Sequence, residues 1–237
     1  MGSDQTNIRN KVLLATRPEA RAFLAEVSEL RPILAGQVLY RDGDEVTHAI
    51  LPHDGIISLT APARDRIVEQ ASIGVEGFVG FNHLMGGTQI TGNAQVVVDG
   101  YATWISLRDL NRGMENFVCV RDAMLVYANS LIVQLMESVL CNSLHPAEQR
   151  VARWLVMASQ RMAEPVFNLT QDTLAQLLGL RRATVSQISA QLAEIGAITY
   201  SRGRLHILDV ERLERYTCEC FRRIRLGLPE RSLQPQA

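Results

Sequence analysis

The sequence predicts an α+β protein with an N-terminal jelly-roll β-barrel, a long helix and a C-terminal winged helix-turn-helix, in that order. Three observations predict it. Short β-rich runs separated by turn signals fill residues 37–106, and an unbroken stretch of periodic apolar residues follows. Two short helices and a hairpin are then expected near the C-terminus. The expected parts are a barrel domain at 1–110, a long helix at 111–142, a winged helix-turn-helix at 143–225 and a disordered tail at 226–237.

A short helix over residues 18–30 is expected ahead of the barrel, because its apolar residues recur at helical spacing. That inner stripe consists of Phe23, Val27 and Leu30. Turn signals such as 53–55 and 99–100 separate the β-rich runs that follow. Short strands at this spacing are typical of a sandwich or a small barrel. The strands are expected at 37–40, 48–51, 56–60, 67–73, 95–98 and 102–106.

A long helix is expected over residues 116–141, because this stretch contains no proline or glycine and its apolar residues recur three and four positions apart. A heptad seam of this kind packs against a partner helix or against the chain's own barrel. Leu131, Met136 and Leu140 lie off the seam, so the helix has two apolar faces. We expect one face to join a second copy of the chain, which makes this the dimerisation helix of a homodimer. The expected seam consists of Leu125, Ala128, Ile132, Leu135 and Val139.

Residues 169–208 predict two helices joined by a tight turn and followed by a basic hairpin. Gly179 suits the end of the first helix, and the second helix spans 181–194 with its basic residues at the start. Helix pairs of this kind also occur in bundles that bind nothing. However, the short turn, the basic helix start and the basic hairpin together favour binding in a DNA major groove. The residues expected to contact DNA are Thr170, Arg181, Arg182, Thr184, Ser186, Gln187, Arg202 and Arg204.

The charge distribution supports a polyanion-binding C-terminal part. Residues 1–141 carry 11 basic and 16 acidic side chains, whereas residues 142–237 carry 13 basic and 9 acidic ones. The net charges are thus −5 and +4, although the whole chain has a net charge of −1. A basic module behind an acidic one fits a DNA-binding domain with a separate sensory part. Neither a charged-then-apolar leader nor an apolar run of membrane-spanning length is evident, so we expect a cytoplasmic protein without a membrane partner.

A barrel, a long dimer helix and a winged helix in this order resemble the family of the cyclic-AMP receptor protein and the fumarate–nitrate reductase regulator. The resemblance covers residues 20–225. It is strongest at LGLRRATVSQ, residues 178–187, where family members typically read L-G-x-S-R-E-T-V-x-R. In the barrel, Gly77-Phe78-Val79-Gly80-Phe81 is similar to the family's short cassette after the central hairpin. The resemblance implies a homodimeric transcription regulator that binds two-fold symmetric DNA operators and contacts RNA polymerase, with a cyclic-nucleotide-binding-like barrel.

Two departures of the recognition helix from the family pattern bear on the reading of bases. Arg182 matches the family's guanine-reading arginine, but Ala183 replaces the usual acidic residue and Gln187 replaces the second arginine. Arginine forms two hydrogen bonds with guanine, and glutamine forms two with adenine. An acidic residue accepts a hydrogen bond from the amino group of cytosine. We therefore expect a half-site that differs from the family's TGTGA-like sequence.

The sensor departs from the family pattern more strongly. By the resemblance, the carboxylate that binds the ribose corresponds to Phe81, and the Arg-Ser pair that binds the phosphate corresponds to Gly92-Asn93. A buried phosphate needs a charge-assisted partner, so we expect no binding of cyclic AMP. The positions of the purine contacts on the long helix are apolar. The residues expected around an effector pocket are Glu76, Phe78, Gly80, Phe81, Gly92, Asn93, Leu135 and Met136.

Other signals and activities stay open or are disfavoured. Cys218 and Cys220 form a close pair, but two thiols alone make an incomplete metal site, so no metal is predicted and only a redox response is kept open. Haem or another small effector is likewise open, with four candidate haem ligands. An enzyme is not expected, because nucleophile-elbow, P-loop and dinucleotide motifs are absent and no catalytic residue is identified. The candidate haem ligands are His48, His53, His83 and Met136.

Overall fold

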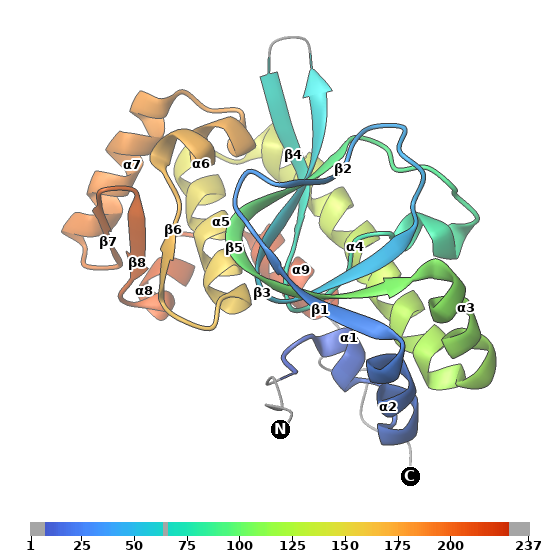
Figure 1. Ribbon diagram of the computed structural model, residues 1–237. Helices are drawn as coiled ribbons and strands as arrows, with labels where there is room; N and C mark the ends of the chain where they lie inside the picture. Colours follow the sequence, from blue (N-terminus) through green and yellow to red (C-terminus); the bar gives the residue numbers. More distant parts are fainter. Residues whose placement is uncertain (1–7, 64–65, 228–237) are drawn as a thin grey trace.

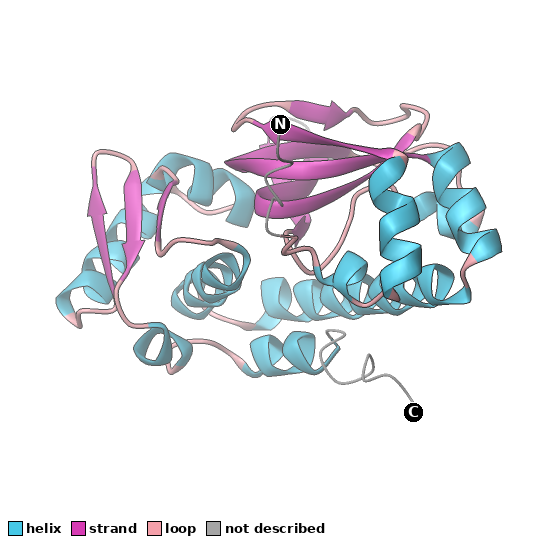
Figure 2. Ribbon diagram, turned by 60° about the horizontal axis from the view of Figure 1, so that its bottom comes forward, coloured by secondary structure: helices cyan, strands magenta, loops and turns pink. Residues whose placement is uncertain are grey.

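The computed structural model describes residues 8–63 and 66–227, and it confirms the α+β fold class. An antiparallel sheet and the long helix α4 (Val118–Leu144) form one half, and a winged helix-turn-helix lies at the other end of the molecule (Figure 1). Figure 2 shows the two sheets separated by helices. The order of these parts along the chain is the one that the sequence predicts.

Two short helices precede the sheet, α1 (Lys11–Leu14) and α2 (Pro18–Glu26). The helix predicted over 18–30 ends early, because the chain continues as strand β1 (Ser28–Ile33). Strand β1 pairs along its whole length with β5, and this ladder satisfies backbone groups that a longer helix would otherwise use. The predicted stripe of Phe23, Val27 and Leu30 is therefore wrong in part. Leu30 lies exposed on β1, and α2 instead buries Ala20 and Leu24.

The large sheet has the strand order β1-β5-β3-β4, with β2 also paired to β5, and every pairing is antiparallel. Four predicted short strands merge into two long ones. The turn signals at 53–55 and 99–100 lie at bulges, where the register between β3 and β5 shifts. Gly55 adopts a φ of +89° there, and a Cβ on Gly100 would overlap the carbonyl of Asp54. The strands are β2 (Val38–Tyr40), β3 (His48–Ala63), β4 (Arg66–Ile73) and β5 (Asn93–Ser106).

Helix α4 is preceded by helix α3 (Leu107–Asn116), which the sequence patterns did not reveal. Ser106 caps α3 by accepting a hydrogen bond from the backbone N–H of Asp109. One face of α4 packs into the core of the sheet through Met124, Tyr127 and Leu131. A 3₁₀ turn, η1 (Phe81–Met85), also contacts α4.

Helix α4 is also apolar along its length. Its mean hydropathy of 1.5 over an 18-residue window satisfies the length and composition of a membrane span, contrary to the expectation from sequence. The helix nevertheless has a buried face against the sheet, and that face includes the polar side chains Gln134 and Ser138. Gln134 Nε2 donates a hydrogen bond to the carbonyl of Ser72 on β4 at 3.1 Å. This packing is typical of the core helix of a globular protein.

The C-terminal half begins with α5 (Ala147–Arg161), which buries Val151, Leu155 and Ala158. After the wing, the chain forms two short helices, because the first ends at Glu214 and the second packs against α4. The remaining elements are β6 (Val166–Asn168), α6 (Gln171–Leu178), α7 (Arg182–Glu194), β7 (Ile198–Ser201), β8 (Arg204–Ile207), α8 (Val210–Glu214) and α9 (Glu219–Gly227).

The two halves share buried surface. Ile56 of β3 and Val98 of β5 belong to the same apolar cluster as the core of the C-terminal half. Trp154 of α5 donates from Nε1 to Glu69 Oε1 on β4 at 2.8 Å, and Ser58 donates to the other oxygen of Glu69 at 2.7 Å. Burial raises the pKa of Glu69, while these hydrogen bonds act in the opposite direction.

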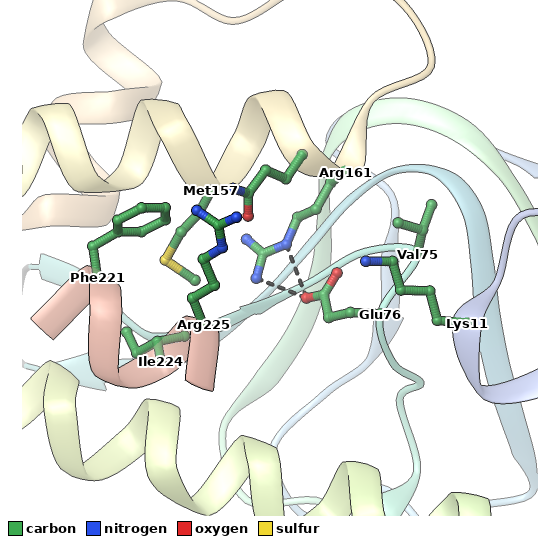
Figure 3. A pocket seen from close by; sticks show the side chains of 9 residues that line it. Lys11, Val75, Glu76, Met157, Arg161, Phe221, Ile224 and Arg225 are labelled. Carbon is green, nitrogen blue, oxygen red and sulfur yellow. Dashed lines mark hydrogen bonds and ion pairs between the residues drawn. The ribbon is translucent and has the colours of Figure 1, made fainter. Parts of the chain in front are cut away.

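Arg161, at the end of α5, makes the central contact between the halves. Its Nε donates to Glu76 Oε1 at 2.9 Å, and a terminal nitrogen lies 2.7 Å from the same carboxylate (Figure 3). The guanidinium also donates to the hydroxyl and the carbonyl of Ser72, at 2.6 and 2.7 Å. The side chains of Arg161 and Glu76 are only 4% and 7% exposed. Gly74 makes room for this arrangement, because a Cβ there would lie 2.5 Å from Arg161 Cγ.

Removing one member of this buried pair should be costly. We predict that Glu76→Gln lowers the free energy of unfolding by about 3–5 kcal/mol, because the arginine charge is left without its carboxylate. Replacing both partners, Glu76→Leu with Arg161→Met, should cost less than the single change, because no unpaired charge remains buried. Urea unfolding at pH 7 measures both variants. A double variant less stable than Glu76→Gln would contradict this account.

His53 is a buried titratable group that the fold keeps neutral. Its Nδ1 accepts from the backbone N–H groups of Arg9 and Asn10, and its Nε2 lies 2.7 Å from Thr103 Oγ1. The ring is 2% exposed. Burial, followed by the charge of Arg9, lowers the pKa of His53 from 6.5 to about 4.

The lowered pKa of His53 predicts a loss of stability in acid. Between pH 6.5 and 4 the unfolded chain binds a proton that the folded chain does not, so the free energy of unfolding falls as the pH falls. The effect of this one group has an upper limit of about 3 kcal/mol. His53→Asn, whose amide oxygen replaces the Nδ1 acceptor, should show a shallower pH dependence than the wild type. Denaturant unfolding between pH 7 and 4 tests this, and equal slopes would contradict it.

Candidate nucleic-acid interface

Helix α6 and the following turn are built from local capping signals. The Thr170 hydroxyl accepts from the backbone N–H of Thr173 at 3.0 Å, which caps the first turn. Gly179 ends the helix with a φ of +63°, and its N–H bonds back to Gln176. The chain then enters α7 with extended backbone at Arg181. These caps fix the angle between α6 and α7.

Helix α7 has one buried and one exposed face. Val185, Ile188 and Leu192 are buried in the core of the C-terminal half. The helix has no side-chain N-cap and no acidic residue in its first turn, so its positive end is not compensated by its own side chains. Thr184 is half-buried. The predicted DNA contacts that lie exposed around the start of this helix are Arg181, Arg182, Ser186 and Gln187.

The hairpin β7–β8 forms the wing. Arg202 and Gly203 adopt φ values of +49° and +80°, which suit the two central residues of a tight hairpin turn. Arg202 and Arg204 are both exposed. The tip of the wing lies beside the start of α6, because Gly203 is adjacent to the Thr170 side chain.

The structure brings several predicted contacts together. Thr170, Arg182 and Arg202 line one surface groove between α6, α7 and the wing, together with Asp172 and Tyr200. A second groove is shared by the turn and the large sheet. It is lined by Ile67, Ala175, Gln176, Gly179, Leu180, Arg181 and Thr184.

The predicted effector residues lie in separate surroundings. Glu76 is paired with Arg161, and Phe78 is fully buried with its ring centroid 5.1 Å from that of Tyr127. Gly92 donates from its N–H to Asp42 Oδ1, and Asn93 Oδ1 accepts from the N–H of Asp42. Gly92 and Asn93 therefore stabilise the loop that contains Asp42.

Gly80, Phe81 and the two predicted positions on α4 likewise have structural environments. Gly80 has a φ of +100°, and a Cβ there would lie 2.9 Å from the carbonyl oxygen of His48. Phe81 and Leu135 pack partly buried against the sheet core. Met136 is 67% exposed. Sequence reasoning could not find Arg161 as the partner of Glu76, because the two residues are 85 positions apart.

A small pocket adjoins the Arg161–Glu76 pair. Figure 3 shows that the long side chains of Lys11, Met157 and Arg225 surround it together with apolar residues of α9. It lies between α5, α9 and the loop after β4, and among the predicted effector residues it includes Glu76 alone. The described residues that line it are Lys11, Val75, Glu76, Met157, Gln160, Arg161, Phe221, Ile224 and Arg225.

The residues predicted for the dimer seam lie on two faces of α4. Leu125, Ile132 and Val139 are exposed, whereas Ala128 is buried within its own chain. Leu135 packs on the sheet core. Met136 is also exposed, so the exposed apolar stripe of α4 consists of Leu125, Ile132, Met136 and Val139.

The three histidines among the candidate haem ligands have hydrogen-bonded rings. His48 Nδ1 lies 2.9 Å from Thr47 Oγ1, and His83 Nε2 lies 2.9 Å from Asn111 Oδ1. Both ring nitrogens of His53 are engaged. The pair Cys218 and Cys220 lies against the end of α4, next to side chains that the sequence did not connect with it.

The C-terminal half matches a known domain. The family model of the Crp-like helix-turn-helix domain matches residues 149–216, which include α6, α7 and the wing. No curated protein sequence matches the chain significantly. The match to the family model therefore identifies the type of domain in the C-terminal half of the chain.

The comparison with solved structures covers most of the chain. FixK2 from Bradyrhizobium japonicum matches with a TM-score of 0.66 and 16% identity, over 81% of this chain and 98% of that protein. The c-di-GMP responsive global regulator CLP from Xanthomonas campestris matches with a TM-score of 0.62 and 16% identity, over 81% and 99%. TTHB099, a CRP family transcriptional regulator from Thermus thermophilus, matches with a TM-score of 0.62 and 16% identity, over 78% and 95%. The C-terminal module is therefore a Crp-like helix-turn-helix domain, and the chain has the fold of the CRP/FNR-type transcription regulators, as the sequence resemblance predicts.

Proposed function

We propose that the protein is a homodimeric, sequence-specific DNA-binding transcription regulator that acts in the cytoplasm without cyclic AMP. The observation that carries the proposal is the exposed basic surface at the start of α7 and on the wing, within a Crp-like helix-turn-helix domain. A helix in the major groove reads base edges with the side chains near its N-terminus. The proposal includes contact with RNA polymerase, and it assigns the protein no enzymatic activity.

The exposed side chains divide into two chemical roles. Arg182 can fork onto guanine O6 and N7, and Gln187 can pair with adenine N6 and N7. The remaining side chains have hydroxyl or guanidinium donors that suit phosphate oxygens and fix the register of the protein on DNA. The phosphate contacts are Thr170, Arg181, Thr184, Ser186, Arg202 and Arg204.

The exposed stripe of α4 supports the dimer. Leu125, Ile132 and Val139 recur at heptad spacing, and Met136 and Val139 are 67% and 70% exposed. A left-handed pair of helices buries such a stripe and leaves the opposite face of each helix on its own sheet. Two copies of α7 would then face successive major grooves, about one helical turn apart.

The environment of Glu76 supports independence from cyclic nucleotides. This carboxylate lies before the position that the family uses for the ribose, and it is already committed to Arg161. Gly92 and Asn93, at the position of the phosphate-binding pair, hold the Asp42 loop. A bound phosphate would have no charged partner at these positions. An effector of another kind, including haem or a redox signal, remains an alternative to constitutive binding.

Fluorescence anisotropy with the purified protein and its own upstream DNA tests the proposal. We expect tight binding that weakens steeply with salt and does not change when cyclic AMP is added. The double variant Arg182→Ala, Arg204→Ala should lose at least about 30-fold in affinity, because one base contact and one phosphate contact are removed.

Arg41→Ala, at an exposed arginine of the sensor half, is the matched control and should bind as the wild type does. Unchanged affinity in the double variant would favour a protein-interaction module over a DNA-binding one. Binding that required cyclic AMP would overturn the assignment of Phe81 and Gly92.

The dimer makes a separate prediction. Ile132→Glu places a charge in the centre of the exposed stripe, so sedimentation equilibrium should show monomers at concentrations where the wild type is dimeric. Leu34→Glu, at a 61% exposed leucine between β1 and β2, should leave the mass unchanged. A dimeric Ile132→Glu variant would place the subunit contact elsewhere.

A further inference from the structure

Four metal-binding side chains meet where α9 packs on the end of α4. Cys141 lies in the last turns of α4, and His145 is the residue that ends this helix. Cys218 precedes α9, and Cys220 lies in its first turn. The three sulfurs and a ring nitrogen of His145 all lie within 4.8 Å of one another. The cluster lies apart from both grooves of the helix-turn-helix.

The distances suit one tetrahedral ion. Zn²⁺ bonds thiolate sulfur at about 2.3 Å and imidazole nitrogen at about 2.0–2.1 Å. A tetrahedron with these bonds places two sulfurs about 3.8 Å apart, and a sulfur and a nitrogen about 3.6 Å apart. The observed separations are 3.6 Å between the sulfurs of Cys141 and Cys218, and 3.6 Å between Cys220 Sγ and His145 Nδ1. These two separations match those of a tetrahedral site, and the four ligand atoms all lie within 4.8 Å of one another.

The surroundings have the features of a closed metal site. The three cysteines are 0–5% exposed, so the sulfurs are shielded from solvent. His145 directs Nδ1 toward Cys220, while its Nε2 lies 3.3 Å from Glu219 Oε1. A carboxylate on the second ring nitrogen is the usual way to orient a metal-binding histidine.

The local charge also fits bound Zn²⁺. Three thiolates around Zn²⁺ leave one net negative charge, and the positive charges of Arg150 and Arg153 on α5 act on Cys141. The Nε atoms of both arginines are buried without a hydrogen-bond partner among the described residues.

We propose that Cys141, His145, Cys218 and Cys220 bind one Zn²⁺ in a closed structural site that fastens α9 to the end of α4. Four protein ligands leave no open position for a substrate, which is typical of structural zinc. Soft thiolate ligands favour zinc over the hard divalent cations. A disulfide between Cys141 and Cys218 would use only two of the four groups, and their sulfurs are well beyond the bonding distance of about 2.05 Å.

Metal analysis and cobalt substitution of the full-length protein test the site. Protein purified without chelators should contain one zinc ion per chain, as measured by inductively coupled plasma mass spectrometry. The reduced, metal-free chain should bind one Co²⁺ and give the intense visible bands of a tetrahedral site with thiolate ligands. Loss of zinc should also lower the midpoint of thermal unfolding.

Single variants identify the ligands. Cys141→Ser and Cys220→Ser should each lower the zinc content and weaken the cobalt bands. Cys119→Ser is the matched control, because Cys119 packs against the sheet core and should keep one zinc per chain. The cobalt titration of the wild type tests for the metal site even if a serine variant fails to fold. Absence of both zinc and tetrahedral cobalt bands would overturn the proposal.

Discussion

The contact of Arg161 with Glu76 and Ser72 is the interaction on which the arrangement of the two halves depends. A charged side chain excluded from water is stable only when its hydrogen-bonding groups are satisfied and its charge is matched. Here the carboxylate matches the charge, and the hydroxyl and carbonyl of Ser72 each accept from a terminal nitrogen of the guanidinium. The geometry therefore fixes the end of α5 relative to the loop after β4. A displacement of either element would leave a buried charge unpaired.

Helix α4 connects this arrangement to the other functions of the chain. One face packs on the sheet, where Gln134 reaches the carbonyl of Ser72, the same residue that receives Arg161. Another face carries the apolar stripe proposed for the dimer, and the end of the helix meets α9 at the cysteine cluster. The sheet, the C-terminal helix and the proposed partner subunit thus all contact the same helix.

The parts of the fold that were predicted correctly depend on local signals. The capping hydroxyl of Thr170, the left-handed Gly179 and the apolar spacing in α7 act within a few residues, and they specify the helix-turn-helix without knowledge of the rest of the chain. A glycine does not by itself distinguish a turn from a bulge. Gly55 therefore appeared to end a strand, whereas pairing with β5 carries the strand through it.

Contacts between distant residues could not be read from spacing. Arg161 and Glu76 are 85 positions apart, and Cys141 and Cys218 are 77 apart, so neither pair leaves a pattern within one segment. The two faces of α4 could not be separated by spacing for a related reason. Its apolar residues serve both the chain's own sheet and an outer surface, and only the position of the sheet shows that Ala128 belongs to the inner face.

The shared core has a practical consequence for dissection of this protein. Ile56 and Val98 complete the apolar cluster of the C-terminal half, and Glu69 and Glu76 supply partners to Trp154 and Arg161. A fragment that starts at α5 would lose all of these neighbours together. It would expose apolar surface that these residues cover, which favours aggregation over independent folding. We therefore expect the helix-turn-helix, although recognisable as a sequence module, to fold only as part of the intact chain.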